Sequence, residues 1–217
     1  MALPVLLLLP AVLLAMAGGK RGGRVGGAPP AIGPWSGGGP PSPIWEGRED
    51  NPETAALLQE MDDYFASYGG IDLNLIDARE VTLLRKWGRH AIPPREYWPR
   101  MAATMRYGFM PLRRALGGAI ILTSAYRPPE YNEYVGGADN SRHMYFEGLD
   151  MVAPTGMANQ QAMLAARMWL QYGERMRMGL GVYGAPGNAT NIHIDTGSNQ
   201  RTWKQADYWI ERVQLAA

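Results

Sequence analysis

The sequence predicts an α+β fold, in which a helical N-terminal part is followed by a small sheet. Two observations support this class. Apolar residues recur at helical spacing over residues 51–118, whereas short runs rich in β-branched and apolar residues follow from residue 119 onward. One long helical pattern, over residues 158–176, interrupts these runs. Helices that come first and strands that are grouped after them are typical of α+β proteins.

Three helices are expected before the sheet. The first, over residues 52–68, follows an Asn-Pro pair that is typical of an N-cap and first turn, and a Gly-Gly pair ends it. The second is predicted over residues 77–89 from the spacing of its apolar residues. The third covers about 95–116, where two prolines are predicted to kink or break it.

The sheet is expected from short runs that are separated by turn residues. The predicted strands cover residues 119–126, 147–153, 179–184 and 191–195. A short helix closed by glycines is expected within residues 128–137, and residues 185–190 are expected to form the loop between the last two strands.

The N-terminus is expected to target or anchor the chain. Residues 1–17 contain an apolar run that is longer than a usual signal-peptide core and slightly shorter than a usual membrane-spanning helix. Its end, Ala15-Met16-Ala17, has the form of a signal cleavage site. The first basic residues follow the run, which leaves open an anchor with the body facing the cytoplasm. We expect a signal peptide or membrane anchor and an exported, periplasmic or envelope-associated protein.

Residues 18–50 are expected to form a linker between this segment and the domain. They are so rich in Gly and Pro that they cannot bury enough apolar surface to offset the entropy of ordering them. Trp35, Ile44 and Trp45 are the residues that we expect to touch the domain. The folded domain is predicted over residues 51–217, and we expect it to act as a monomer.

Charge and composition exclude several classes of function. The chain has 21 Lys and Arg residues against 20 Asp and Glu residues, and this net charge of +1 does not favour nucleic acid as a partner. Cysteine is absent, which excludes disulfides, thiolate zinc sites and thiol catalysis. Any metal ion must therefore be bound by His, Asp or Glu side chains.

Two of the three histidines lie near acidic residues in the sequence. His143 precedes Asp150 by seven residues, a separation of roughly 23 Å along a strand and about 10 Å along a helix, so the two can share an ion only if the chain bends between them. Asp150 lies in a predicted buried strand, where a carboxylate must be paired or bind a metal. His193 and Asp195 are two residues apart and face the same side of a strand.

Spacing alone leaves two interpretations of these residues open. Either they form a joint metal site, or they are unrelated polar residues, since a lone histidine in a strand is most often structural. A His-Xaa-Asp pair also occurs in the facial triad of non-haem iron oxygenases, but there a second histidine follows the pair. No histidine follows Asp195, so the order of residues argues against an oxygenase.

Two segments of the chain carry a more specific signal. They are LTSAYRPPEYNEYVGGADNSRHMYFEGLDMV and GLGVYGAPGNATNIHIDTGSNQRTW. They resemble the zinc D-alanyl-D-alanine carboxypeptidase family, and within it the small peptidoglycan peptidase-like domains. That family has a Ser-Xaa-His-(six residues)-Asp motif followed by a later His, often as His-Xaa-Asp. The matching residues here are Ser141, His143, Asp150, His193 and Asp195.

The resemblance implies a small, mostly antiparallel sheet that carries a zinc site and packs against helices. It implies that His143, Asp150 and His193 bind Zn²⁺, which leaves a fourth position for water, as in catalytic zinc sites. The implied activity is hydrolysis of a peptide bond in the stem peptide of peptidoglycan, either D-Ala-D-Ala or L-Ala-D-Glu. The family's Ser-Xaa-Tyr-Arg turn is matched by Arg127, which would bind the substrate carboxylate or the developing oxyanion.

The general base of this reaction is the main departure from the family pattern. Several relatives have an acidic residue three positions before the last histidine, where this chain has Thr190. Asp195 is the expected substitute as the catalytic base, or else it orients His193. Glu147 and Asp139 are weaker candidates for the base.

A second departure lies near the first histidine, and the departures together leave an alternative function open. Many relatives have Gly at the position of Phe146 and Ala at that of Gly148, so a larger side chain near the site could reshape the substrate groove. The alternative function is a non-catalytic, zinc-containing wall-binding or structural module, because the hedgehog signalling domain resembles the same zinc fold. Thr190 favours this alternative, and Arg127 argues against it.

Overall fold

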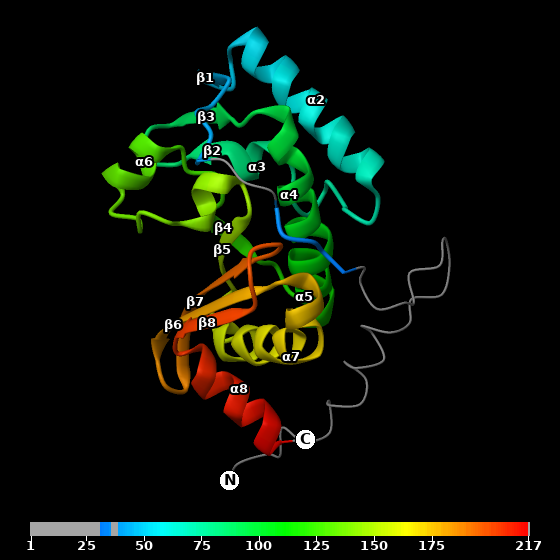
Figure 1. Ribbon diagram of the computed structural model, residues 1–217, viewed down its shortest axis with the longest axis vertical. Coiled ribbons are helices and arrows are strands. Elements are labelled where there is room, and N and C mark those ends of the chain that lie inside the picture. Colours follow the sequence, from blue (N-terminus) through cyan, green and yellow to red (C-terminus); the bar gives the residue numbers. More distant parts are fainter. Residues whose placement is uncertain (1–30, 36–38, 217) are drawn as a thin grey trace.

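The computed structural model describes residues 31–35 and 39–216 (Figure 1). Its helices are α2 (Pro52–Tyr68), α3 (Ala78–Thr82), α4 (Trp98–Thr104), α5 (Met110–Leu116), α6 (Pro129–Tyr134), α7 (Ala158–Met176) and α8 (Ala206–Leu215). Its strands are β1 (Trp45–Gly47), β2 (Leu83–Leu84), β3 (Arg89–Ile92), β4 (Ile121–Ser124), β5 (Gly148–Val152), β6 (Gly179–Ala185), β7 (Asn188–Asp195) and β8 (Arg201–Lys204). Shorter helical turns are η2 (Arg95–Tyr97), the π-helical η3 (Met105–Phe109) and η4 (Arg142–Tyr145). The predicted α+β class is confirmed.

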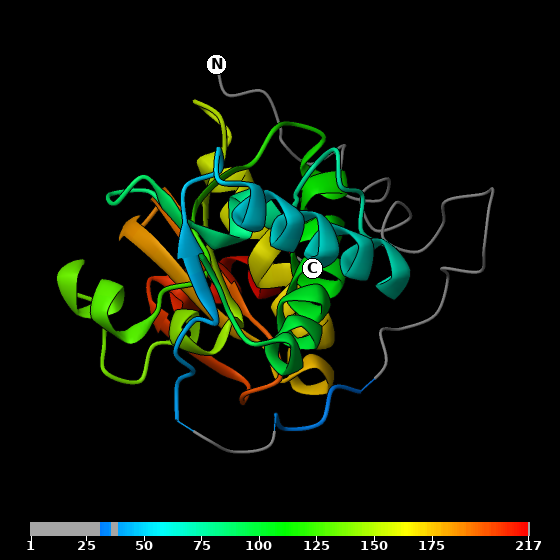
Figure 2. The ribbon, with the colours of Figure 1, turned by 90° about the horizontal axis from the view of Figure 1, so that it is seen from above.

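The strands of the described residues form two sheets. The larger has five strands in the order β4-β5-β7-β6-β8, and of its four pairs only β6–β8 is parallel. The smaller has the order β1-β3-β2 and is antiparallel. Figure 1 shows the larger sheet in the lower half of the molecule and the smaller one near α2 at the top. Viewed from above, α2 lies across the top of the molecule beside β1 (Figure 2). The expected mostly antiparallel sheet is confirmed.

The two faces of the larger sheet differ in character. Leu149 and Met151 of β5 and Ile192 and Ile194 of β7 are fully buried, and α7 packs against β6 and β7. Because side chains alternate along a strand, the residues between them project from the opposite face. That second face therefore carries the polar residues that the sequence singled out.

The first predicted helix is confirmed as α2. The side chain of Asn51 accepts hydrogen bonds from the backbone N–H groups of Glu53 (2.8 Å) and Thr54 (3.3 Å), as expected for an N-cap. Gly69, at φ 77°, ends the helix in a conformation that favours glycine.

The predicted helix over residues 77–89 is wrong beyond Thr82. The chain instead forms the hairpin β2–β3, with Gly88 at φ 61° in its turn. Leu84 and Ile92 are fully buried in this arrangement, and the other edge of β3 pairs with β1. Burial in the smaller sheet therefore outweighs the helical spacing of the apolar residues.

Residues 95–116 form the irregular helical segment that the prolines predicted. Pro99 lies in the first turn of α4, where a backbone N–H has no helical partner to lose. Pro111 lies in the first turn of α5, directly after the π-helical turn at residues 105–109. The irregularity is therefore a wider turn that accommodates the second proline, and Gly117 at φ 67° ends the segment.

Part of the expected linker packs on the domain. The Trp35 Nε1–H donates to the carbonyl of Thr196 (3.0 Å), and the backbone N–H of Ile44 donates to the carbonyl of Ile92 (2.8 Å). Trp45 begins strand β1, which pairs with β3. The contacts expected of these three residues are thus present, and ordered structure begins before residue 51. The domain boundaries themselves stay a prediction.

The C-terminal part contains two elements that the sequence reasoning did not assign. Strand β8 pairs in parallel with β6, and helix α8 packs on α7 and β8. Trp209, Ile210 and Val213 of α8 are buried at helical spacing, which is the signal that could have predicted it. The predicted loop at residues 185–190 is mostly strand, because β6 and β7 extend to a tight turn at Pro186-Gly187.

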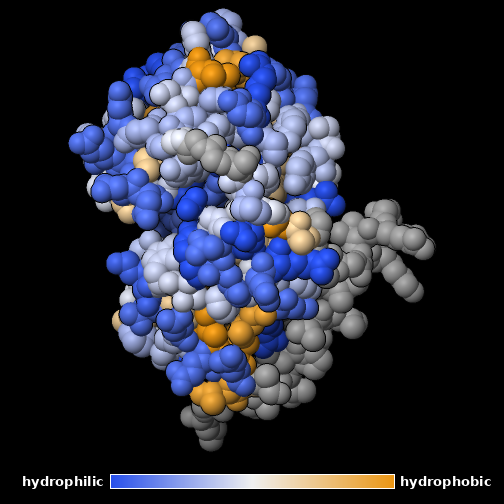
Figure 3. Space-filling view, in the orientation of Figure 1, coloured by the Kyte–Doolittle hydropathy of each residue, from blue (hydrophilic) through white to orange (hydrophobic). Residues whose placement is uncertain are grey.

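The predicted signal peptide or anchor, residues 1–17, lies outside the described residues. Of the helices in the described part, none has the length and apolar character needed to cross a membrane. The face shown in Figure 3 is mainly hydrophilic, with small separate hydrophobic areas. The monomeric state stays a prediction.

Candidate metal centre

Asp150 and His193 lie directly opposite each other on adjacent strands. The register of β5 and β7 pairs Asp150 with His193, so their side chains project together from the polar face of the sheet. The Asp150 Oδ1 lies 2.8 Å from the His193 Nδ1. Sequence alternation in two neighbouring strands is therefore sufficient to bring these two groups together.

His143 joins them because the chain bends sharply after η4. Phe146 has φ 57°, in the left-handed region, and it turns the chain from η4 back into β5. Gly148 then allows a close approach, since a Cβ at this position would lie 2.7 Å from the His193 Cε1. The His143 Nε2 lies 3.1 Å from the Asp150 Oδ2 and 3.1 Å from the His193 Nδ1. The bend that a shared site requires is present.

The phenyl ring of Phe146 points into the core rather than into a substrate groove. This side chain is fully buried. Its ring packs edge to face on Tyr126, with 5.6 Å between the ring centroids. The expectation that a larger residue here reshapes the groove is therefore not supported by the direction of the side chain.

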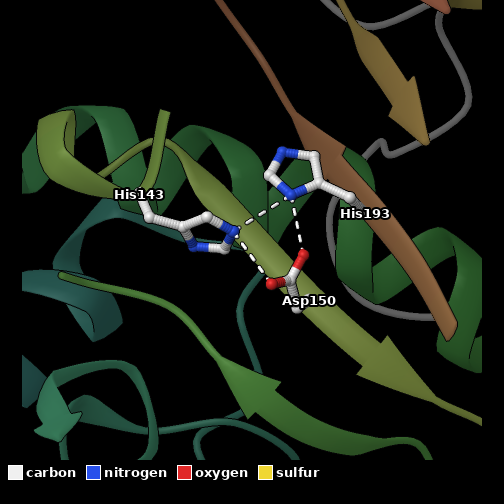
Figure 4. Close-up of side chains that lie close together, drawn as sticks. All are labelled: His143, Asp150 and His193. Carbon is white, nitrogen blue, oxygen red and sulfur yellow. Dashed lines mark hydrogen bonds and ion pairs between the residues drawn. The ribbon is translucent and has the colours of Figure 1, made fainter. Parts of the chain in front are cut away.

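The three side chains have the geometry of a metal site. One ligand atom from each of His143, Asp150 and His193 lies within 4.8 Å of the others, and all three residues are buried. Figure 4 shows them pointing toward one another from η4, β5 and β7. Ligands about 2.0 Å from a tetrahedral zinc ion are roughly 3.3 Å apart. The observed separations of 2.8–3.1 Å between ligand atoms fit this donor set.

In both imidazole rings, the nitrogen that points away from the cluster has a hydrogen-bond partner. The His143 Nδ1 lies 2.6 Å from the carbonyl oxygen of Ala125, so this nitrogen donates and the Nε2 lone pair faces the cluster. The His193 Nε2 lies 3.1 Å from the Asp195 Oδ2, which leaves Nδ1 to face the cluster. Such partners fix the tautomer of metal-binding histidines.

The comparison with protein families agrees with this centre. A family model described as Peptidase M15 matches residues 82–195. The chain belongs to the peptidase M15 family. This is the zinc D-alanyl-D-alanine carboxypeptidase-like family that the motifs resemble, and M15 membership makes the chain a metallopeptidase homologue. The matched segment contains His143, Asp150 and His193. A comparison with curated proteins finds no match.

In this M15 chain, Asp195 lies behind His193 and not beside the cluster. The carboxylate contacts the ring nitrogen that points away from Asp150. It is fully buried and forms a forked ion pair with Arg201, whose Nη2 and Nη1 lie 2.7 and 3.1 Å from its two oxygens. Of the two roles expected for Asp195, this position favours orientation of His193 over proton transfer to water.

Arg201, the ion-pair partner of Asp195, is a residue of this region that the sequence reasoning missed. A buried carboxylate needs a partner, and Arg201 is the first basic residue after Asp195 in the sequence. That signal could have identified it.

Arg127 lies against the cluster of His143, Asp150 and His193. Its Nε donates to the Ser124 Oγ (2.7 Å), and its Nη2 donates to the Asp150 Oδ2. The side chain is largely shielded, with 16% exposed. The guanidinium group therefore places a fixed positive charge at the edge of the cluster.

Burial and pairing set the charges in the cluster. Burial lowers the pKa of His143, which keeps this imidazole neutral and able to bind a metal. Burial alone would raise the pKa of Asp150, but the two imidazoles hold it well below its usual range. Burial alone would lower the pKa of His193, but hydrogen bonds to Asp150 and Asp195 raise it to about 9. The cluster therefore holds an ionised carboxylate between one neutral and one protonated ring.

The weaker candidates for a general base are Asp139 and Glu147, and Thr190 occupies the position that is acidic in several relatives. Thr190 is exposed and lies at the irregularity where β6 and β7 shift register. Asp139 is exposed in the turn before η4. Glu147 is buried and forms an ion pair with the Arg100 Nη1 (2.7 Å). The carboxylate of Glu147 is thus paired with an arginine of α4.

Replacing Glu147 by glutamine is expected to change how stability depends on pH. Burial raises the pKa of Glu147 from 4.5 to about 7, despite the opposing charges of Arg142 and Arg100. A raised pKa stabilises the fold below pH 4.5, and this contribution is lost as the pH rises to 7. The unfolding free energy of wild type relative to Glu147→Gln should therefore fall by about 3 kcal/mol between pH 4 and pH 8. Denaturant titration of metal-free protein measures this difference.

A matched variant supplies the control for this measurement. The carboxylate of Glu60 on α2 is hydrogen-bonded by Arg95, which lowers its pKa. Glu60→Gln should therefore give a slope of opposite sign, since the wild-type contribution is lost on acidification. Equal slopes for the two variants would contradict the assignment of a raised pKa to Glu147.

Proposed function

We propose that this protein is a zinc-dependent peptidase that hydrolyses a peptide bond in the stem peptide of peptidoglycan, in the manner of a D,D-carboxypeptidase. The convergence of His143, Asp150 and His193 in a chain of the M15 family carries this proposal. We further propose that the domain acts in the cell envelope, where this substrate lies, and that the apolar N-terminal segment directs it there.

The two rings are already oriented to bind the ion, and His193 would lose its Nδ1 proton when the ion binds. Ala125 and Asp195 hold the two rings so that His143 Nε2 and His193 Nδ1 face the same point. Zinc bound there would lower the pKa of a water molecule to near 7 and polarise the scissile carbonyl. Because the rings do not need to reorient, little conformational entropy is lost when the ion binds.

Arg127 supplies the positive charge for the substrate. Its guanidinium group lies beside Asp150 and is held by Ser124. From there it would bind the terminal carboxylate of a stem peptide or stabilise the oxyanion that forms at the scissile carbonyl. A forked donor that is held in place suits either role.

The alternative function is a non-catalytic, zinc-containing wall-binding module. Asp195 is engaged by both His193 and Arg201, and Thr190 cannot act as a base. These observations favour a site that binds zinc without an efficient base, whereas the position of Arg127 favours catalysis.

Mass spectrometry of muropeptides separates the two functions. Purified peptidoglycan is incubated with zinc-loaded protein, and His143→Ala serves as the control. New cleavage products that disappear in the variant support the peptidase. Zinc binding without new products supports the binding module. Cleavage that survives His143→Ala would defeat the proposed mechanism.

Asp195→Asn is expected to weaken zinc binding without removing a ligand. The amide keeps the size of the side chain but loses the charge that holds the Nε2 proton of His193, and such losses typically cost 10–100-fold in metal affinity. Competition with a chelator of known affinity measures the change. Asp63→Asn, at an exposed position on α2, is the matched control. An affinity equal to that of wild type in folded Asp195→Asn would contradict the positioning role.

A further inference from the structure

Two side chains of strand β8 extend across the neighbouring strand β6 toward the candidate metal centre. The register of the sheet places Arg201, Gly179 and Asp195 in one row across β8, β6 and β7. It places Trp203, Gly181 and His193 in the next row on the same face. In each row the middle residue is a glycine, so the side chain from β8 lies over β6 instead of beside it.

The first row depends on the absence of a side chain at Gly179. A Cβ at this position would lie 2.4 Å from the Asp195 Oδ2 and 2.9 Å from the Arg201 guanidinium carbon. The Arg201–Asp195 ion pair therefore occupies the space above this glycine. Because Asp195 is fully buried, its charge needs partners, and His193 and then Arg201 lower the pKa of this carboxyl group.

The second row depends in the same way on Gly181. A Cβ there would lie 2.5 Å from the Trp203 Cε2. The indole ring instead extends across β6 and packs on the ring of His193, with 5.0 Å between ring centroids and 58° between the planes. The Trp203 Nε1 lies 3.4 Å from the hydroxyl oxygen of Tyr183, which holds the other end of the indole.

We propose that β8 positions the metal ligand His193, with Arg201 acting through Asp195 and Trp203 packing directly on the imidazole ring. The two side chains constrain the ring in different ways. Arg201 fixes the carboxylate that accepts from Nε2, and Trp203 limits rotation of the ring about its Cβ–Cγ bond. Strand β8 lies after the segment 82–195 that the M15 model matches. The inference rests on the proposed zinc site.

Two predictions distinguish positioning from general structural support. In metal-free protein, the His193 ring should be held with a proton on Nε2, and Arg201→Gln should shift its ring nitrogen signals. Long-range ¹H–¹⁵N spectra can resolve this ring because the chain has only three histidines, and His193→Gln assigns the signals. In zinc titrations against a chelator, Arg201→Gln should raise the dissociation constant about tenfold, near the lower end of the range for lost partners of metal ligands.

Matched variants keep this test decisive. Arg212→Gln removes an exposed arginine on α8 and should leave both readouts within twofold of wild type. Arg201→Lys keeps the charge but loses the forked contact, so it should give an intermediate affinity, and it replaces Arg201→Gln if that variant does not fold by circular dichroism. Trp203→Leu should weaken zinc binding and broaden the His193 signals with Asp195 unchanged.

The outcomes also separate this inference from the proposed function. Zinc affinity and ring signals that stay at wild-type values in folded Arg201 and Trp203 variants would overturn the inference alone. If His143→Ala binds zinc as tightly as wild type, the proposed zinc site fails, whatever the β8 variants do. The ring spectra of metal-free protein test the positioning of His193 even in that case.

Discussion

His143→Ala is expected to abolish tight zinc binding at one ion per chain and to lower the rate of stem-peptide hydrolysis by at least about a thousandfold. The variant removes one of the three proposed protein ligands, and the bound metal would supply several kcal/mol of transition-state stabilisation. It also leaves Asp150 and His193 as the two remaining members of the proposed ligand set. Metal analysis after dialysis and initial rates on a defined stem peptide measure the two effects.

The third histidine offers a matched control for this variant. His90 is also buried, in β3, where its Nδ1 lies 2.9 Å from the Thr82 hydroxyl oxygen, in the smaller sheet. His90→Ala should therefore retain one zinc ion per chain and most of the activity. Equal loss of zinc in both variants would show that the loss is not specific to His143 and would contradict its assignment as a ligand.

Arg127→Met is expected to reduce kcat/KM about 100–1000-fold while the protein still binds zinc. The variant removes a charge that would stabilise the substrate carboxylate or the oxyanion, and the loss of one such donor has this magnitude in other hydrolases. Because Arg127 also pairs with Asp150, zinc affinity should change, but by less than the activity. Steady-state kinetics together with chelator competition separate the two effects.

Two further variants define the role of Arg127. Arg127→Lys keeps the charge without the forked donors, so activity should recover only in part. Arg167→Gln, on α7 away from the polar face of the sheet, should leave kcat/KM within twofold of wild type. Full activity in Arg127→Met would remove this residue from the substrate site.

The direction in which Asp150 and His193 project from their strands was predictable from the sequence, whereas the pairing of the strands and the position of His143 were not. Alternation in two apolar strands places both polar residues on one face, and only the pairing of these strands had to be found. His143 reaches the same point through a left-handed residue, Phe146, that no sequence rule for large residues would predict. The family motif supplied this part of the site.

The elements that sequence reasoning missed depend on long-range pairing. The segment after Thr82 has helical spacing, but its apolar side chains are buried by a hairpin whose outer partner, β1, comes from a glycine- and proline-rich region. Strand β8 is short and pairs in parallel with β6. Parallel strands are not joined by a tight turn, so the sequence next to β8 contains no hairpin signal. Both cases are decided by distant residues and not by local spacing.

Phe146 connects the metal ligand to the stability of the whole domain. A left-handed conformation costs a non-glycine residue about 1–2 kcal/mol, whereas a fully buried phenyl ring contributes about 1.5–3 kcal/mol. Glycine, which many relatives have at this position, would avoid the cost of the left-handed conformation but would lose the stabilisation from the buried ring. In this chain the buried phenyl ring of Phe146 thus anchors in the core the turn that positions His143. Heating or mutations that loosen the interior should release zinc at the same midpoint at which the protein melts.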